Sequence, residues 1–291
     1  MTKLVILGCE NTHANGFLAI INDKKLYPDL EVVGVYSDDA EASRKLNEKY
    51  GVNVLSSYDE AVGKVDGVIV TARHGDNHLK YARPYMASGI PMFIDKPITC
   101  SEEDALELAR LARANGVKLC GGSICPFYPE TIELARRVKS GELTQICAGH
   151  VSAPFSPVND YGNFYFYTEH LVDMMTAVFG FNVLEVCADI RDITASVIAH
   201  YDNINVTGTY TSQQIPNPYT ITVYAHEEIA TVVTSPTSDS YIDELESLLR
   251  LIRGEEMDRS YEEFIFPSFM LNAIVRSSES GKREKIHEIK L

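Results

Sequence analysis

The sequence predicts an α/β fold in two domains: a doubly wound parallel sheet, then an α+β domain with a mostly antiparallel sheet. Three observations predict this fold. The chain of 291 residues is long enough for two hydrophobic cores. Its first 122 residues alternate Val- and Ile-rich runs with amphipathic stretches, as in a parallel sheet covered by helices on both faces. Its second half carries β-rich runs separated by turns. The change of rhythm at Gly121-Gly122 places the domain boundary there, giving residues 1–122 and 123–291.

The expected elements of each domain follow from the apolar runs and the turn residues between them. Ser101 with Asp104 forms a helix-start pattern, and Gly116 ends the same helix. In the first domain we expect strands at residues 3–7, 30–36, 52–55, 68–71, 91–94 and 117–120, and helices at 14–22, 39–50, 58–62, 77–88 and 101–115. In the second we expect helices at residues 128–140, 169–179, 241–253 and 267–280, and strands at 146–152, 185–190, 195–201, 206–212, 220–225 and 229–233.

Charge and composition exclude several classes of partner. The chain has 26 Lys and Arg against 41 Asp and Glu, a formal net charge of −15, which repels the phosphate backbone of nucleic acids. No apolar run approaches the roughly 20 residues that span a bilayer, and the N-terminus lacks a signal-peptide cleavage pattern. We therefore expect a cytoplasmic protein with no membrane or nucleic-acid partner. The six cysteines include no C-x-x-C pair, so the spacing predicts neither a metal site nor a disulfide framework.

The end of the first expected strand is a candidate phosphate-binding turn. It reads Gly8-Cys9-Glu10-Asn11-Thr12-His13, and of the glycines in a G-x-G-x-x-G turn only Gly8 is present. Glu10 stands where the backbone would approach a pyrophosphate. Thr12 is suited to cap a helix whose N–H groups attract phosphate. An ordinary strand-to-helix turn explains the same residues.

The end of the second expected strand supplies a candidate ribose-binding group. Ser37 and Asp38 follow the strand, and an acidic residue at this position hydrogen-bonds the adenosine ribose in NAD-dependent enzymes. Asp38 disfavours a 2′-phosphate, so the sequence favours NAD over NADP. A pair of residues that caps the following helix is the alternative explanation.

Further segments follow one another in a recognisable order. Val68-Ile69-Val70-Thr71-Ala72-Arg73 leads to a helix with His78, and Gly89–Pro97 ends in Asp95-Lys96-Pro97. Glu169-His170-Leu171-Val172-Asp173 and the run at residues 273–282 come later. Together these segments resemble the Gfo/Idh/MocA family of oxidoreductases, whose members show strands ending Ala-Thr-Pro and Glu-Lys-Pro, an H-x-x-D helix and a similar closing helix.

The resemblance implies a two-domain NAD(P)-dependent dehydrogenase that acts on a sugar, cyclitol or related polyol. Its first domain would be a Rossmann domain, and its second would carry an open-faced sheet that forms a homodimer or homotetramer. The resemblance implies Lys96 as the lysine near nicotinamide and substrate and His170 as the acid/base, with Glu169 and Asp173 as further catalytic candidates. The cofactor-binding candidates are Gly8, Glu10, Asn11, Thr12, His13, Ser37, Asp38, Thr71, Ala72, Arg73, His74, His78, Asp95 and Lys96.

The residue types at two of these positions suit the chemistry. Hydride transfer from a carbinol needs a proton acceptor near the hydroxyl and a cation to stabilise the developing alkoxide. Lys96 precedes Pro97, which holds its backbone extended, and histidine titrates near neutrality. Without the ordered segments, a solvated loop lysine and a structural histidine would be the simpler explanations. We expect His78 to order the loop beneath the cofactor, and Asp173 to orient His170 or to cap the helix.

The chain departs from the family pattern at several positions. Phe166 stands four residues before His170, where the family has an Asp, and Ser123-Ile124-Cys125-Pro126-Phe127 replaces a run like Asn-Arg-Arg-Phe. With Glu10, these changes support an alternative from another class, a catalytically silent protein that senses a ligand or the redox state. A metal-dependent hydrolase or lyase is disfavoured because no ligand spacing such as H-E-x-x-H is present.

The segment Phe155–Tyr167 is rich in Tyr and Phe and also contains Asn159, Asp160 and Asn163. Aromatic faces and amide groups suit a polyol, so we expect this segment to lie over the substrate pocket. A packed loop at a dimer contact is the alternative.

Overall fold

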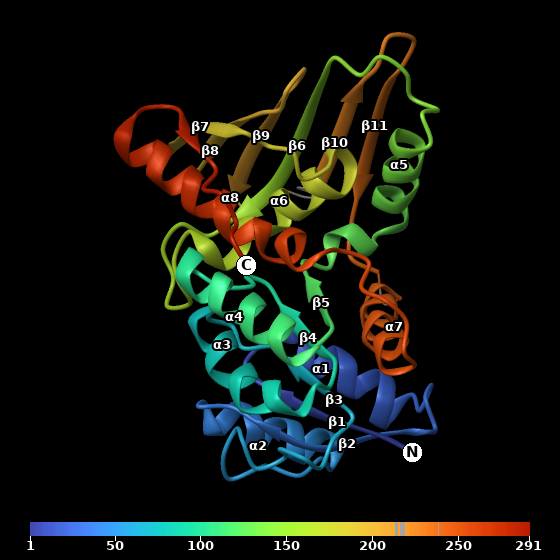
Figure 1. The fold of residues 1–291 in the computed structure, drawn as a ribbon. Helices are drawn as coiled ribbons and strands as arrows, with labels where there is room; N and C mark the ends of the chain where they lie inside the picture. Colours follow the sequence, from blue (N-terminus) through green and yellow to red (C-terminus); the bar gives the residue numbers. More distant parts are fainter. Residues whose placement is uncertain (213–214, 216–218, 238) are drawn as a thin grey trace.

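The parallel sheet predicted for the first domain is present. The computed structural model describes residues 1–212, 215, 219–237 and 239–291. The first sheet has five strands in the order β2-β1-β3-β4-β5, and every pair of neighbours is parallel (Figure 1). Its strands are β1 (Thr2–Leu7), β2 (Leu30–Tyr36), β3 (Gly67–Val70), β4 (Met92–Asp95) and β5 (Leu119–Gly122).

The continuous apolar run of β1 reflects burial on both faces of this sheet. Leu4 and Ile6 point into one hydrophobic core, while Val5 and Leu7 point into another on the opposite face. A strand that alternates between two cores has no polar face, which is why its sequence shows no alternation. Helices cover both faces: α1 (Thr12–Leu18), which continues as the π-helix η1 (Ala19–Asp23), α2 (Ala40–Tyr50), α3 (Asp76–Ala82), which continues as the 3₁₀-helix η2 (Arg83–Ser88), and α4 (Glu102–Asn115).

Two short elements expected in the first domain are not formed. The strand expected at 52–55 is reduced to one bridge between Val54 and Val35, and the helix expected at 58–62 is a series of turns. The helix expected at 77–88 changes to 3₁₀ geometry at Arg83. Pro84 follows immediately, and because proline lacks the N–H that an α-helical bond requires, the tighter turn is favoured there.

The second domain contains a seven-stranded sheet with the order β11-β10-β6-β9-β8-β7-β12. All neighbours are antiparallel except β6 and β9, which are parallel. The mostly antiparallel sheet is therefore confirmed, with one parallel pair at its centre. Its strands are β6 (Ala148–Phe155), β7 (Glu185–Ile190), β8 (Ala195–His200), β9 (Asn205–Ser212), β10 (Tyr219–Tyr224), β11 (Ile229–Thr234) and the two-residue β12 (Glu284–Lys285), which was not predicted.

Helices cover one face of the second sheet and leave the other face open. The covering helices are α5 (Pro129–Lys139), preceded by the 3₁₀-helix η3 (Cys125–Phe127), α6 (Tyr165–Phe179) and α8 (Tyr261–Ser280) (Figure 1). Side chains on the open face include Cys187, Ile198, Ile229 and Val233, all of them exposed. The assignment of this face to an oligomer contact remains a prediction.

Two helices of the second half return to the parallel sheet. Leu245 and Leu248 of α7 (Ser240–Ile252) lie in the same core as Leu4, and Phe264 of α8 lies in the core on the other face of the sheet. Met270, further along α8, packs in the core of the second domain. The two domains are therefore joined by shared helices as well as by the connection after Gly122.

Two helices begin four or more residues earlier than predicted. The first turn of α8 starts at Tyr261, six residues before the expected start at Pro267, because Ser260 and Glu263 form a capping box. Pro267 was expected to be the first residue of this helix, but it lies inside the helix. Helix α6 starts at Tyr165 instead of Glu169, so His170 lies in its second turn and not at its start.

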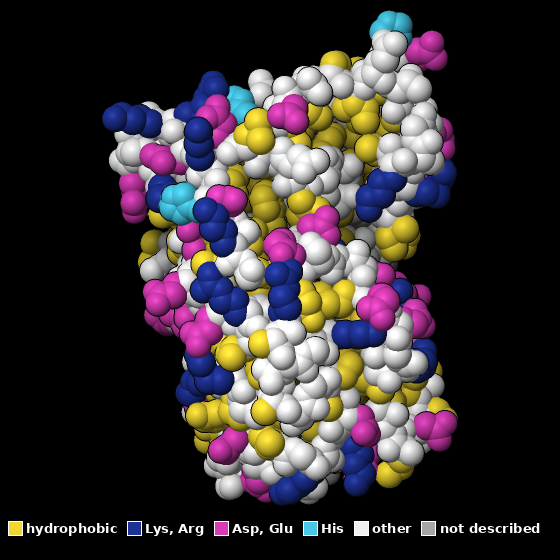
Figure 2. Space-filling model, viewed as in Figure 1, with side chains coloured by type: hydrophobic (Ala, Val, Ile, Leu, Met, Phe, Trp, Pro, Cys, Tyr) yellow, Lys and Arg dark blue, Asp and Glu magenta, His cyan; other side chains and the backbone are white. Residues whose placement is uncertain are grey.

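Within the described residues, no helix combines the length and the apolar character needed to cross a membrane. On the face drawn in Figure 2, acidic and basic side chains are interspersed.

Candidate active site

Lys96 lies in the interior at the junction of the two domains. It follows β4, is 4% exposed, and its Nζ donates a hydrogen bond to the carbonyl oxygen of Phe166 at 3.3 Å. Burial lowers the pKa of the Lys96 ammonium, an effect opposed by the negative charges of Asp95 and Glu169. A lysine in this state loses a proton more easily than a solvated one and interacts more strongly with a nearby oxyanion.

Aromatic side chains of α6 and of the preceding loop cover this lysine. The Nζ of Lys96 lies 4.5 Å from the ring centre of Phe166 and 5.0 Å from that of Tyr167. The guanidinium of Arg73 lies 4.5 Å from the ring of Tyr161, and this ring packs on Phe166. Phe166, found where the family has an Asp, therefore contributes a carbonyl acceptor and a cation–π surface. Phe166 and Tyr167, at the end of the aromatic segment, therefore contact Lys96, while the placement of this segment over a substrate remains a prediction.

His170 faces the same region from α6. Its Nδ1 lies 2.7 Å from the Oγ of Ser123 and 3.5 Å from the Sγ of Cys125, and its ring packs against Tyr167. Burial, with smaller effects from Lys96 and His13, lowers the pKa of His170 well below its ordinary value. The imidazole is therefore neutral at neutral pH and able to accept a proton.

Asp173 reaches His170 only through Ser123. The Oδ2 of Asp173 accepts a hydrogen bond from the backbone N–H of Ser123 at 2.7 Å, and the Oγ of Ser123 contacts the Nδ1 of His170. Gly122 makes this approach possible, since a Cβ there would lie 2.7 Å from Oδ2 of Asp173. Of the two roles expected for Asp173, the structure supports orientation of His170, acting through the loop after β5.

Glu169 and His78 hold the backbone that follows Lys96. The Oε2 of Glu169 accepts a hydrogen bond from the N–H of Ile98 at 2.9 Å, and burial raises the pKa of this carboxyl group well above its ordinary value. The ring nitrogens of His78 lie 2.8 Å from the carbonyl oxygen of Ala72 and 3.2 Å from that of Ile98. Glu169 therefore points toward this backbone rather than toward the ring of His170, and His78 joins the loops after β3 and β4.

A second set of ionisable groups lies inside the fold behind Lys96. His13 Nδ1 is 3.2 Å from Asp95 Oδ2, and His13 Nε2 is 3.4 Å from Glu244 Oε2. Burial raises the pKa of Glu244 to about 7. Burial alone would lower the pKa of His13, but the negative charges of Asp95 and Glu244 outweigh this effect and raise the pKa of His13 above its ordinary value. Asn11 donates to the same Asp95 oxygen at 2.6 Å. These three predicted cofactor contacts, Asn11, His13 and Asp95, are thus buried and bound to one another.

The turn after β1 is packed tightly against the end of β3. Gly8 has φ +88°, and a Cβ there would lie 2.2 Å from the backbone nitrogen of Ala72. Thr71 Oγ1 donates to the carbonyl oxygen of Gly8 at 2.5 Å. The helix cap is Asn11, whose Oδ1 accepts from the N–H of His13, and not Thr12 as expected. Gly8 is therefore required by the packing of β1 on the end of β3.

The carboxylate of Glu10 occupies the space between the ends of the first three strands. Its Oε2 accepts from the hydroxyl of Ser37 at 2.5 Å and its Oε1 accepts from the N–H of Arg73 at 3.0 Å. A cavity of about 420 Å³ adjoins it, with Asp38, Asp39, Asp76 and Asp160 among the lining residues and no Lys or Arg. This acidic lining suits a diol and opposes a diphosphate.

Asp38 stands where a ribose diol is bound in NAD enzymes. Lys80 lies 2.7 Å from its Oδ2, and this hydrogen bond, with one from Tyr36, lowers the pKa of Asp38 despite partial burial. The ribose end of NAD therefore fits the residues present. The diphosphate of NAD fits this place when the charge of Glu10 is neutralised or when the side chain of Glu10 turns away from the diphosphate.

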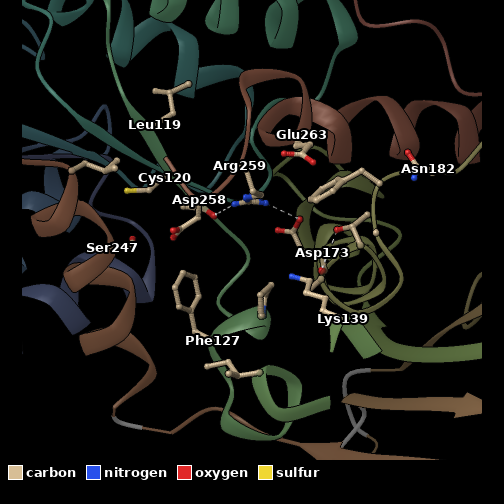
Figure 3. A pocket seen from close by; sticks show the side chains of 18 residues that line it. Leu119, Cys120, Phe127, Lys139, Asp173, Asn182, Ser247, Asp258, Arg259 and Glu263 are labelled. Atoms are coloured by element: carbon tan, nitrogen blue, oxygen red, sulfur yellow. Dashed lines mark hydrogen bonds and ion pairs between the residues drawn. The ribbon is translucent and has the colours of Figure 1, made fainter. Parts of the chain in front are cut away.

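Another cavity adjoins Asp173 and is lined by neither Lys96 nor His170. It has a volume of about 600 Å³ between β5, α6 and the loop before α8. Figure 3 shows Arg259 and Asp173 pointing toward each other at its centre, with their nearest charged atoms 3.7 Å apart. Arg259 also donates to the carbonyl oxygen of Gly121 at 2.6 Å. This pair supports the loop that carries Ser123 and forms no part of the Lys96–His170 region.

Sequence reasoning missed Ser123 and Glu244. Ser123 belongs to a run identified only as a departure from the family pattern, and its contact with His170 spans two elements. Glu244 had a signal: it falls at helical spacing between Tyr241 and Leu248, on the buried stripe of α7. A carboxylate on an apolar stripe indicates a buried partner.

Comparisons with known proteins agree with this fold. Residues 2–123 match the family described as "Oxidoreductase family, NAD-binding Rossmann fold" (GFO_IDH_MocA). A protein of Escherichia coli (strain K12) named "Uncharacterized oxidoreductase YhhX" is 26% identical over 140 residues, which are 44% of this chain and 40% of that protein. The chain thus matches less than half the length of this curated relative.

Two solved structures share the fold over nearly the whole chain. A myo-inositol dehydrogenase from Corynebacterium glutamicum superposes with a TM-score of 0.81 at 18% identity, covering 99% of each chain. The WlbA dehydrogenase from Chromobacterium violaceum, in complex with NADH and UDP-GlcNAcA, has a TM-score of 0.80 at 17% identity, covering 100% of this chain and 97% of the other. The match of residues 2–123 to this family and the two-domain fold shared with these structures support the resemblance found in the sequence: the first domain of this chain matches the Gfo/Idh/MocA family of oxidoreductases.

Proposed function

We propose that this protein is an NAD-dependent dehydrogenase that transfers a hydride between nicotinamide and a carbinol carbon of a sugar, cyclitol or related polyol. The observation that carries the proposal is the joint placement of Lys96 and His170. They come from different domains, are both 4% exposed, and both contact Tyr167. A cation and a neutral base at one place are the two groups that oxidation of a carbinol requires.

Each of the two side chains has a defined part in this reaction. Bound NAD supplies the hydride acceptor. Lys96 binds the substrate oxygen through Nζ and stabilises the negative charge that develops on it. His170 accepts the hydroxyl proton, and its Nδ1 contact with Ser123 fixes the ring so that Nε2 is the nitrogen available to substrate. In the reverse direction the same imidazole returns the proton.

A polyol is the substrate class that the surroundings favour. Tyr161, Phe166 and Tyr167 offer aromatic faces to the C–H groups of a sugar ring, while Lys96 and His170 offer polar contacts to its hydroxyls. Two structural neighbours, a myo-inositol dehydrogenase and a dehydrogenase in complex with NADH and UDP-GlcNAcA, support the same class of substrate. For the cofactor, the carboxylate of Asp38 supports NAD over NADP because it repels a 2′-phosphate.

Glu10 supports a second candidate function, a catalytically silent protein that binds a ligand or senses the redox state. Its carboxylate accepts two hydrogen bonds in the place where a diphosphate would approach the backbone. A silent protein has no need of a desolvated lysine beside a neutral histidine, which is why we place this candidate second.

NADH fluorescence distinguishes the two candidates. The chain contains no Trp, so the emission of bound NADH is measured against little protein background. The dehydrogenase proposal expects enhanced NADH emission and, with myo-inositol or another polyol and NAD, turnover that is lost in Lys96→Met. Binding of NADH with no turnover across a polyol panel favours the sensor. Failure of both NADH and NADPH to bind the folded protein contradicts the dehydrogenase proposal. Gly8 is unsuitable as a test position because a side chain there disrupts the packing of β1.

A further inference from the structure

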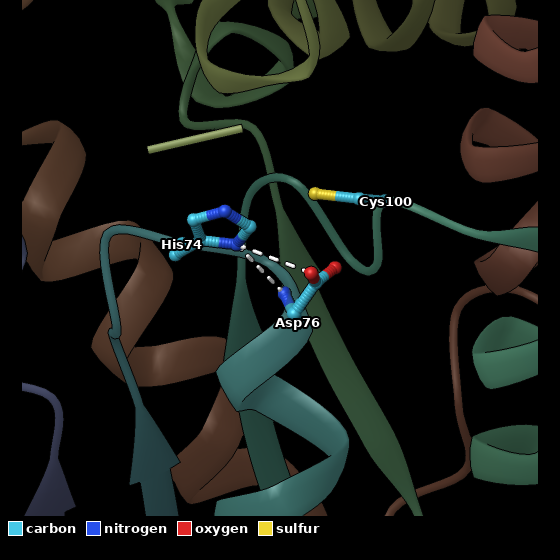
Figure 4. Close-up of side chains that lie close together, drawn as sticks. All are labelled: His74, Asp76 and Cys100. Carbon is cyan, nitrogen blue, oxygen red and sulfur yellow. Dashed lines mark hydrogen bonds and ion pairs between the residues drawn. The ribbon is translucent and has the colours of Figure 1, made fainter. Parts of the chain in front are cut away.

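We propose that His74, Asp76 and Cys100 form a binding site for a divalent transition-metal ion of the Zn²⁺ class at the mouth of the acidic cavity. Each residue offers one ligand atom, and the three atoms all lie within 4.8 Å of one another. Figure 4 shows the imidazole, the carboxylate and the thiol directed toward a common space. The inference concerns a site separate from Lys96 and His170 and does not depend on the proposed dehydrogenase activity.

The separations of the ligand atoms suit a tetrahedral ion after a small contraction. Nitrogen, oxygen and sulfur ligands at about 2.0–2.3 Å from a tetrahedral centre lie about 3.3–3.6 Å from one another. The Nδ1 of His74 is already 3.7 Å from an Oδ2 of Asp76. The Sγ of Cys100 lies within 4.8 Å of both atoms and completes the set, and water is expected at the remaining position.

The Nδ1 of His74 is a hydrogen-bond acceptor in this structure. The backbone N–H of Asp76 donates to the Nδ1 of His74 at 3.3 Å, so this nitrogen carries a lone pair on the side of the carboxylate. An ion at this place replaces one weak hydrogen bond by a coordination bond. The thiol of Cys100 releases its proton to solvent when it binds the ion.

The surroundings favour a cation and leave it a route from solvent. Asp76 is exposed, and with His74 it also lines the acidic cavity to which Glu10, Asp38 and Asp160 contribute carboxylates. A negative field of this kind concentrates cations. A His, Cys and carboxylate set selects Zn²⁺ or Co²⁺ over Mg²⁺ or Ca²⁺, which prefer oxygen ligands alone.

The aromatic segment, Phe155–Tyr167, covers the other side of the site. A Cβ at Gly162 would lie 3.1 Å from the Sγ of Cys100 and 3.6 Å from Cε1 of the His74 ring, so the loop backbone lies directly on both side chains. The three ligand residues come from the loop after β3, the start of α3 and the loop after β4. An ion there joins the loop after β3 to the loop after β4. The spacing of these residues contains no metal motif because they come together only in the fold.

Cobalt binding tests the site through a signal that only a thiolate ligand produces. The full-length protein is first treated with EDTA and then titrated with Co²⁺, and the thiolate-to-cobalt charge-transfer band is recorded. We expect a band that saturates at one equivalent and is displaced by Zn²⁺. Cys100→Ser should abolish the band. Asp76→Asn, which keeps the thiol, should weaken Co²⁺ binding by about 100-fold or more, since changes outside the ligand shell already cost about 10–100-fold.

Cys147→Ser is the matched control, because Cys147 is an exposed cysteine outside the cluster and its loss should leave the band unchanged. Circular dichroism of each variant shows whether the fold is retained. The absence of a thiolate band in the native protein, or a band of equal intensity in Cys100→Ser, overturns the proposal.

Discussion

The Oγ of Ser123 lies 2.7 Å from the Nδ1 of His170, so a hydroxyl group fixes the ring of the proposed base. The same hydroxyl accepts a hydrogen bond from the backbone N–H of Cys125 at 3.0 Å, which holds it in place. Ser123 is therefore a positioning residue, since it acts on substrate only through His170.

Ser123→Ala is expected to lower kcat by about tenfold and to change KM little, because the ring of His170 loses its fixed orientation while the substrate contacts remain. The pH profile separates this role from a merely structural one. In the native protein, burial keeps the pKa of His170 below 6.5, so the rate of polyol oxidation falls only as the pH drops through that lowered value. Ser123→Ala should move this acidic limb, and Ser123→Thr, which keeps the hydroxyl, should restore it. An unchanged limb in Ser123→Ala would argue against positioning.

Removal of the amine of Lys96 is expected to abolish most of the turnover while the fold is retained. Lys96→Met keeps the length and apolar character of the side chain and its packing beneath Phe166, but leaves the developing alkoxide without a cation. We expect kcat to fall by about 10²–10³-fold. Steady-state kinetics and thermal unfolding check both parts, and Lys45→Met, which removes an exposed lysine of α2, is the control. Turnover that survives in Lys96→Met places the catalytic cation elsewhere.

Neutralising Glu10 is expected to strengthen NADH binding. Glu10→Gln keeps the shape of the side chain and an oxygen that can accept a hydrogen bond, but removes a negative charge from the place that a diphosphate would occupy. An increase in affinity of about tenfold corresponds to about 1.4 kcal/mol. Fluorescence titrations at low and high salt measure it, and the advantage of the variant should shrink as salt screens the native charge. Equal affinities at low salt would show that Glu10 already turns away from the cofactor.

The buried carboxyl of Glu244 predicts a pH-dependent stability. Its pKa rises from 4.5 to about 7 on folding, so the folded state holds its proton more tightly than the unfolded state. A group of this kind adds stability below its unfolded pKa and loses that contribution as the pH rises through its folded pKa. The native free energy of unfolding should therefore fall by about 3 kcal/mol between about pH 4.5 and 7 from this group.

Glu244→Gln removes this ionisation, so its stability should depend less on pH than that of the native protein over the same range. Denaturant titrations at pH 5 and pH 8 measure the difference. Glu246→Gln, which changes a carboxylate on the same helix that pairs with Arg253, is the control. Parallel curves for the native protein and Glu244→Gln would show that Glu244 is not the group responsible.

The parts of the fold that the sequence predicted are those with a local cause. The run Leu4–Leu7 is apolar throughout because it faces two cores, so its burial is visible without any partner. Gly116 ends α4 with φ +66°, as its position after the helix predicts. The predicted start of α8 was wrong. Proline is typical of a first helical turn, which favoured Pro267, but the capping box of Ser260 and Glu263 begins the helix at Tyr261.

Only the candidate site residues that belong to a motif could be predicted from the sequence. Lys96 and His170 were identified through the ordered segments that resemble the family. The contact of His13 with Glu244, and the cluster of His74, Asp76 and Cys100, depend on loops and helices that meet only in the fold. No periodicity or spacing connects such residues, so their partners cannot be read from a single chain.

The hydrogen bond from Lys96 to the carbonyl oxygen of Phe166 joins a strand end of one domain to a helix of the other. An ammonium has three N–H donors, so two of them stay available to a substrate oxygen while this contact is kept. The contact therefore holds Nζ in place before substrate arrives, and the junction of the two domains, rather than either domain alone, sets the position of the proposed catalytic cation.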